Sequence, residues 1–133
     1  MSIVKNLEIK INNGEAKLSE NVYVYQNDRG IDLYIKIVIP KLQIGGRNTS
    51  MLSEFDGAKA GVTIVKPNGN IIGKSKMDIV DDAIKFVIDK DLTDDLDEVG
   101  IYRMQFHLYD ENDNRITIPP VEFEVKALIG IIP

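Results

Sequence analysis

Alternation of apolar and polar residues with a period of two is the feature that most limits the fold of this chain. It is clearest over residues 102–108, where Tyr, Met, Phe and Leu alternate with Arg, Gln and His. The same pattern occurs over residues 7–11, 31–39, 84–88 and 121–125. Successive side chains of a strand point to opposite faces of a sheet, so each segment predicts a β-strand with one buried face.

Turn residues stand between these segments. The first segment ends at Asn12-Asn13-Gly14, and both Asn and Gly tolerate the positive φ values of tight turns. Residues 62–66 and 70–74 flank Pro67-Asn68-Gly69, which predicts a β-hairpin because Pro fits the first central turn position and Gly a left-handed one. Pro40 lacks a backbone N–H and should end the strand that begins at residue 31.

Helical signals are confined to one short stretch. Thr93 is a candidate N-cap, followed by Asp94 and Asp95 where a helix N-terminus favours carboxylates, and Gly100 suits the exit. Residues 41–59 show no regular period, and we expect a long connection there.

The predicted fold is an all-β, Ig-like antiparallel β-sandwich of about eight strands with at most short helical turns. The strands are expected to be mostly antiparallel because their links are short, and a small barrel is the alternative. A chain of 133 residues can form one domain with a substantial core, which we place at residues 1–126. Residues 127–133 break the alternation and are expected to be an apolar C-terminal tail, either an interface or the start of a missing linker.

Composition argues against several classes of function. The formal net charge is −5, with 16 Lys and Arg against 21 Asp and Glu, whereas a nucleic-acid binder needs a basic face. The absence of Cys excludes disulfides and thiolate chemistry, and a single His excludes a multi-His metal site. The start of the sequence does not resemble a secretory signal, and the longest apolar runs fall short of the roughly 20 residues that span a bilayer. We therefore expect no nucleic-acid partner and no membrane insertion.

Residues capable of catalysis are few. His107 is the sole candidate imidazole base, but it falls on the polar face of its strand without a Gly-x-Ser-x-Gly elbow, which favours an ordinary sheet-face His. Asp78, Asp81, Asp82 and the acidic run over 89–98 could supply paired carboxylates, yet each lies where a turn or a helix cap requires one. We predict that the chain is not an enzyme and has no cofactor.

The polar segment Asp110-Glu111-Asn112-Asp113-Asn114 carries oxygen ligands at close spacing, as a calcium loop does. It lacks the central Gly and the terminal Glu of an EF-hand loop, and a hairpin tip has the same composition. The tip is the favoured interpretation, so no metal site is predicted, although calcium binding stays open.

Three tyrosines form a candidate partner-binding face. Tyr23, Tyr25 and Tyr34 could line an aromatic strip that contacts a sugar or a protein. Tyrosine is also a common strand residue on outer faces, so the pattern alone leaves both interpretations open.

The order and spacing of the strand patterns from Ile31 to Val125 resemble the N-terminal domain family of phage baseplate upper proteins, which are siphophage tail-tip proteins. The residues that carry the resemblance are Asp32-Leu33-Tyr34-Ile35-Lys36-Ile37, Val62-Thr63-Ile64-Val65-Lys66-Pro67-Asn68-Gly69, Ile84-Lys85-Phe86-Val87-Ile88, Gly100-Ile101-Tyr102-Arg103-Met104-Gln105-Phe106 and Val121-Glu122-Phe123-Glu124-Val125. The opening segment over residues 7–11 and the strand from Tyr23 to Tyr25 also fit the family.

The resemblance implies a structural component of the virion, made in the bacterial host cytoplasm and located in the tail baseplate. Such domains anchor near the tail hub in several copies and support host-adhesion proteins. The implied partners are other copies of the chain and other tail or baseplate proteins. The apolar tail then becomes a candidate interface, through Ala127, Leu128, Ile129, Ile131 and Ile132. The alternative is a carbohydrate- or cell-surface-binding β-sandwich module that uses the three tyrosines.

Overall fold

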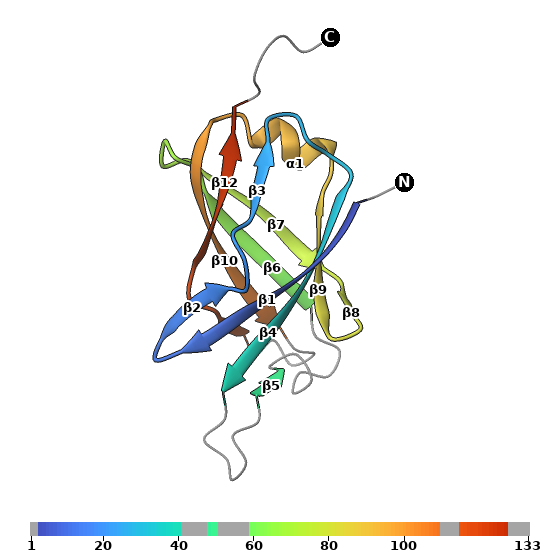
Figure 1. The fold of residues 1–133 in the computed structure, drawn as a ribbon, viewed down its shortest axis with the longest axis vertical. Coiled ribbons are helices and arrows are strands. Elements are labelled where there is room, and N and C mark those ends of the chain that lie inside the picture. The colour runs from blue at the N-terminus through green and yellow to red at the C-terminus, as the bar shows by residue number, and fades with distance from the viewer. Residues whose placement is uncertain (1–2, 41–47, 51–58, 110–114, 128–133) are drawn as a thin grey trace.

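Two six-stranded sheets pack face to face in a computed structural model of the chain, which describes residues 3–40, 48–50, 59–109 and 115–127 (Figure 1). The all-β sandwich predicted from the alternation is confirmed. The expected Ig-like character stays a prediction. Within the described residues there are twelve strands and one short helix.

Sheet 1 has the strand order β2-β1-β4-β9-β8, with β5 beside β4. Its strands are β1 (Ile3–Asn12), β2 (Glu15–Leu18), β4 (Ile31–Pro40), β5 (Asn48–Ser50), β8 (Ile79–Val80) and β9 (Ala83–Ile88). Sheet 2 has the order β3-β12-β10-β6-β7, with β11 beside β10. Its strands are β3 (Tyr23–Tyr25), β6 (Lys59–Val65), β7 (Ile71–Met77), β10 (Gly100–Tyr109), β11 (Arg115–Thr117) and β12 (Val121–Lys126).

Two strand pairs are parallel, which departs from the antiparallel expectation. β1 runs parallel to β4 from Ile3 opposite Ile31 to Lys10 opposite Val38, and β3 runs parallel to β12. Both pairs arise because the chain changes sheets after β2 and again after β3, so strands that pair are not consecutive in sequence. Short links predict antiparallel neighbours only while the chain stays within one sheet.

The strand count also exceeds the expected number of about eight, because several strands are too short to show an alternating pattern. β2 has 4 residues, β5 and β11 have 3 each, and β8 has 2. β5 lies inside the segment that was expected to be a long connection.

The core lies between the two sheets and is filled by the apolar half of each alternating segment. Ile9, Ile35 and Leu108 are completely buried, while their chain neighbours face outward. Phe86 of sheet 1 and Phe106 of sheet 2 meet edge to face with ring centroids 6.1 Å apart, which links the two layers. The period-two pattern therefore identified the buried face correctly.

The predicted turns form as expected. Asn13 and Gly14 have φ values of 54° and 79° and make the two-residue link between β1 and β2. Gly69 has a φ of 91° in the hairpin between β6 and β7, where its N–H donates to the Lys66 carbonyl at 2.9 Å. β4 ends at Pro40.

Helix α1 (Lys90–Asp95) begins earlier than the sequence indicated. Its N-cap is Asp89, whose carboxylate accepts a hydrogen bond from the Leu92 N–H at 2.9 Å, so the predicted cap at Thr93 is wrong. Thr93 is instead buried within the helix, and its hydroxyl donates to the Asp28 carbonyl. Among the described residues, no helix is long and apolar enough to cross a membrane.

Candidate functional site

The three candidate tyrosines do not share one face. Tyr23 and Tyr25 stand on the outer face of sheet 2, where Val24 between them is buried. Tyr34 lies on β4 of sheet 1, opposite Asn6 and Lys85. The expected three-residue strip is therefore wrong for Tyr34, because the chain crosses from one sheet to the other between β3 and β4.

Tyr23 and Tyr25 form a small aromatic cluster with Lys126. Their rings meet edge to face at a centroid distance of 6.0 Å. The Lys126 ammonium lies 4.2 Å from the centroid of the Tyr23 ring, a distance at which a cation is attracted to the aromatic face. Tyr23 remains 51% exposed, but Lys126 covers one face of its ring.

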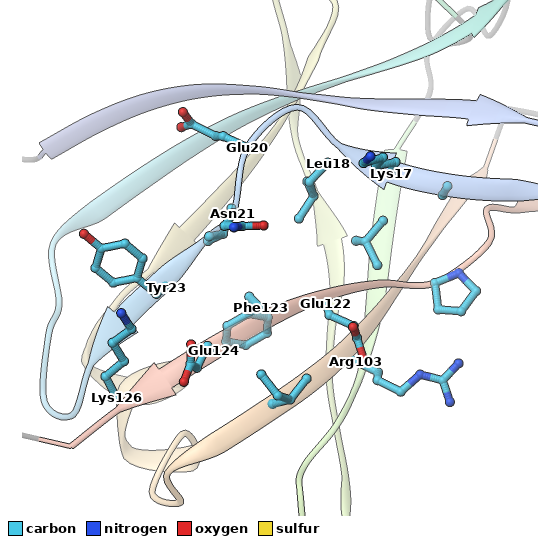
Figure 2. A pocket seen from close by; sticks show the side chains of 15 residues that line it. Lys17, Leu18, Glu20, Asn21, Tyr23, Arg103, Glu122, Phe123, Glu124 and Lys126 are labelled. Atoms are coloured by element: carbon cyan, nitrogen blue, oxygen red, sulfur yellow. The ribbon is translucent and has the colours of Figure 1, made fainter.

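A groove of about 800 Å³ adjoins this cluster, between β2 and the segment that follows it on one side and β12 and β10 on the other (Figure 2). Tyr23 and Lys126 lie at one end of the groove and Arg103 at the other. Apolar side chains contribute to its wall, among them the buried Phe123 and the half-buried Leu18. We call this feature the β2–β12 groove.

Charged side chains line the β2–β12 groove in equal numbers. The cations are Lys17, Arg103 and Lys126, and the anions are Glu20, Glu122 and Glu124. Arg103 and Glu122 occupy directly opposite positions on β10 and β12. An opening with three charges of each sign suits an uncharged ligand better than a polyanion or a polycation.

Two free strand edges open into the β2–β12 groove. β2 is the edge strand of sheet 1, and β1 occupies its other side. On β12, the Glu124 N–H donates to the Val22 carbonyl and the Lys126 carbonyl accepts from the Gln26 N–H, so the even-numbered residues of β12 face β3. Among the residues that the structure describes, β3 pairs only with residues 124–126. The peptide group of Glu122 therefore faces the groove with no strand beside it in the described part of the chain.

The outer edge of β3 is blocked at Tyr25. The Asp28 carboxylate accepts a hydrogen bond from the Tyr25 N–H at 3.0 Å. A carboxylate in this position occupies a donor that an added strand would need and repels an approaching carbonyl. Strand addition at Tyr25 is thus disfavoured.

The candidate interface at the C-terminus is described only at its first residue. Ala127 follows β12 and is exposed. Leu128, Ile129, Ile131 and Ile132 lie outside the described residues, as does the segment Asp110–Asn114 that was weighed as a calcium loop. Within the described residues, no group of three or more acidic or His side chains could hold a metal ion.

His107 is held between two threonines on the outer face of sheet 2. Its Nε2 lies 3.2 Å from the Thr63 hydroxyl and its Nδ1 lies 2.9 Å from the Thr117 hydroxyl. Partial burial, assisted by the nearby Arg115, lowers the pKa of His107 below its ordinary value. Both ring nitrogens are engaged by side chains of neighbouring strands, so the geometry is that of a cross-strand link.

The candidate carboxylates have structural roles, either in a turn or in an ion pair. Asp81 and Asp82 have φ values of 50° and 64° and form the two-residue turn between β8 and β9. Asp78 pairs with Lys59 at 2.8 Å, and this hydrogen bond lowers the pKa of Asp78. In the acidic run, Asp97 pairs with Lys66 at 2.6 Å, and that bond likewise lowers the pKa of Asp97.

Comparison with known proteins identifies the fold. Among solved structures, the N-terminal domain of phage TP901-1 ORF48 matches with a TM-score of 0.60 and 13% sequence identity. The match covers 93% of this chain and 98% of that one. The chain has the fold of this phage domain. The resemblance predicted from the sequence is therefore confirmed for the fold, while no family model and no curated protein matches the chain.

The sequence did not predict the β2–β12 groove. Its lining comes from β2, β3, β10, β12 and the links between them, which become neighbours only when the chain changes sheets. The Tyr23 and Tyr25 pair gave a local signal, because two aromatic residues flank a buried Val in a strand. No local sequence signal indicated the free edge at Glu122, since that edge depends on β3 being shorter than β12.

Proposed function

We propose that this chain is a structural component of a phage tail baseplate, where it anchors and oligomerises near the tail hub and supports host-adhesion proteins. The observation that carries this proposal is the fold shared with the N-terminal domain of phage TP901-1 ORF48 over nearly the full length of both chains. In this role the chain is not an enzyme, its partners are other copies of itself and other tail proteins, and its location is the virion.

The surface of the domain supports a role in assembly. Apolar side chains are exposed on several strands: Ile71 is 68% exposed and Ile101 is 49% exposed, in addition to Tyr23 and Tyr25. Ile3 and Val4 of sheet 1 are exposed as well. Exposed apolar side chains are compatible with surfaces that contact other proteins. Edge strands with unpaired backbone groups are also compatible with a protein whose neighbours cover them.

The alternative function is a carbohydrate- or cell-surface-binding module centred on Tyr23 and Tyr25. The exposed aromatic rings beside a groove favour it, because sugars pack against aromatic faces. Lys126 argues against it, since its ammonium already occupies one face of the Tyr23 ring.

Native mass and glycan binding distinguish the two functions. Light scattering at micromolar concentration should give a multiple of the 14.9 kDa chain mass, and a glycan array should give no binding. Deletion of residues 127–133 should lower that mass. A monomer that binds a defined glycan would overturn the structural proposal in favour of the alternative.

A further inference from the structure

We propose that the β2–β12 groove of one copy receives the apolar C-terminal segment, residues 128–133, of a neighbouring copy. This inference rests on the proposed oligomerisation and names the surface that would carry it. The occupant is the sequence Leu-Ile-Gly-Ile-Ile-Pro, which has no charged side chain.

The groove is long enough to hold residues 128–133 in extended conformation. The groove follows β12 from Pro120 to Lys126, a distance of about 20 Å at the usual rise of a strand. Six residues in extended conformation also span about 20 Å. An extended segment of this size can therefore occupy the whole groove.

The groove and the segment also agree in chemistry. Ile101, which is 49% exposed, and the half-buried Leu18 offer apolar surface to the branched side chains of the segment. The charges around the opening cancel in sign, which suits an uncharged occupant. The unpaired peptide group of Glu122 offers a donor and an acceptor to the backbone of an added strand.

The segment that enters the groove belongs to another copy. β12 delivers its own C-terminal segment at Lys126 and Ala127, beyond the part of the strand where the edge is free. To reach Glu122 in the same copy, the segment would have to reverse and pass over Tyr23. A tight reversal would take about two of these residues out of contact with the groove. A segment from a neighbour needs no reversal.

Contacts of this kind join the tail of one copy to the groove of the next. Such head-to-tail contacts close into a ring when the rotation between copies allows it. A ring of this kind is compatible with the proposed oligomerisation.

Cross-linking tests the contact directly, because the natural chain has no Cys. Asn21 is exposed and lines the groove, so a mixture of the single variants Asn21→Cys and Ile131→Cys should form a disulfide-linked dimer under mild oxidation. The matched control is Lys36→Cys mixed with Ile131→Cys. Lys36 is also exposed but lies on β4 of sheet 1, outside the groove, and should give at least tenfold less dimer.

A second measurement uses native mass. Asn21→Trp should fill the groove and reduce the assembled mass to 14.9 kDa, whereas Lys36→Trp should leave the assembly unchanged. Circular dichroism of both variants checks that the fold is retained. An assembled wild-type chain whose mass survives Asn21→Trp and whose Asn21→Cys variant gives no dimer overturns the groove contact alone. A monomeric wild-type chain contradicts the proposed oligomerisation as well.

Discussion

The Tyr102 hydroxyl forms hydrogen bonds with both backbone polar groups of Glu98, donating to the carbonyl at 2.8 Å and accepting from the N–H at 3.0 Å. Glu98 lies in the link between α1 and β10, where the chain passes from sheet 1 to sheet 2. A tyrosine that forms hydrogen bonds with the backbone a few residues upstream at such a crossing resembles the tyrosine corner known from Ig-type sandwiches. Tyr102 is completely buried, and burial raises the pKa of its hydroxyl.

Removal of this hydroxyl should destabilise the crossing. Tyr102→Phe keeps the ring and its stacking on Phe123 but leaves the Glu98 peptide groups without their partner. We expect a loss of about 1–3 kcal/mol in the free energy of unfolding, measured by urea denaturation. Tyr25→Phe, at an exposed ring, is the control and should change it by less than about 0.5 kcal/mol. Equal midpoints for the two variants would show that the corner does not stabilise the fold.

The N-cap of α1 should make the free energy of unfolding depend on pH in the acidic range. The hydrogen bond from the Leu92 N–H holds the pKa of Asp89 below its ordinary value of 3.8. Because the folded pKa is depressed, the stabilisation is present above about pH 4 and is lost as the pH falls through the folded pKa. Asp89→Ala should cost about 1 kcal/mol at neutral pH.

The measurement for Asp89 is urea denaturation at pH 7 and at pH 2.5. The difference between wild type and Asp89→Ala should shrink in acid, while Asp91→Ala, in the exposed first turn, should have a smaller effect at both values. A difference that stays constant with pH would contradict a role for the ionised carboxylate.

His107 should titrate below its ordinary pKa of 6.5, because partial burial and Arg115 disfavour the imidazolium. The unfolded chain then binds the proton more tightly, so the free energy of unfolding should fall as the pH drops from 6.5 through the folded pKa. An NMR titration of the ring measures the pKa directly. A value above 6.5 would mean that the link to Thr63 and Thr117 favours the charged form.

The turn at Asp81 and Asp82 should tolerate replacement. Both residues adopt the left-handed backbone that Asn-Gly favours in two-residue hairpins. The double variant Asp81→Asn, Asp82→Gly should raise the free energy of unfolding by about 1 kcal/mol, measured by thermal or urea denaturation. The control variant Lys74→Asn, Ser75→Gly places Asn-Gly inside β7. It should lower the free energy of unfolding, since Gly weakens a strand interior. Loss of stability at the turn would show that the two carboxylates have a role other than chain reversal.

The sequence predicted the fold class and most of the long strands because their alternation is local. Residues 102–108 show which side chains are buried without reference to any other segment. The cap at Asp89 was missed because Thr93, four residues later, is also a favoured capping residue, and only tertiary contact with Asp28 places it inside the helix. Parallel pairing and the β2–β12 groove depend on where the chain changes sheets, which no local pattern records.

The location of the chain tests the central claim most directly. Phage particles carrying this sequence can be purified and labelled with gold-tagged antibodies raised against residues 1–126. We predict that label lies at the tail tip in electron micrographs, in particles that also contain the chain by mass spectrometry. Intact particles that lack the chain would contradict the proposed role in the baseplate.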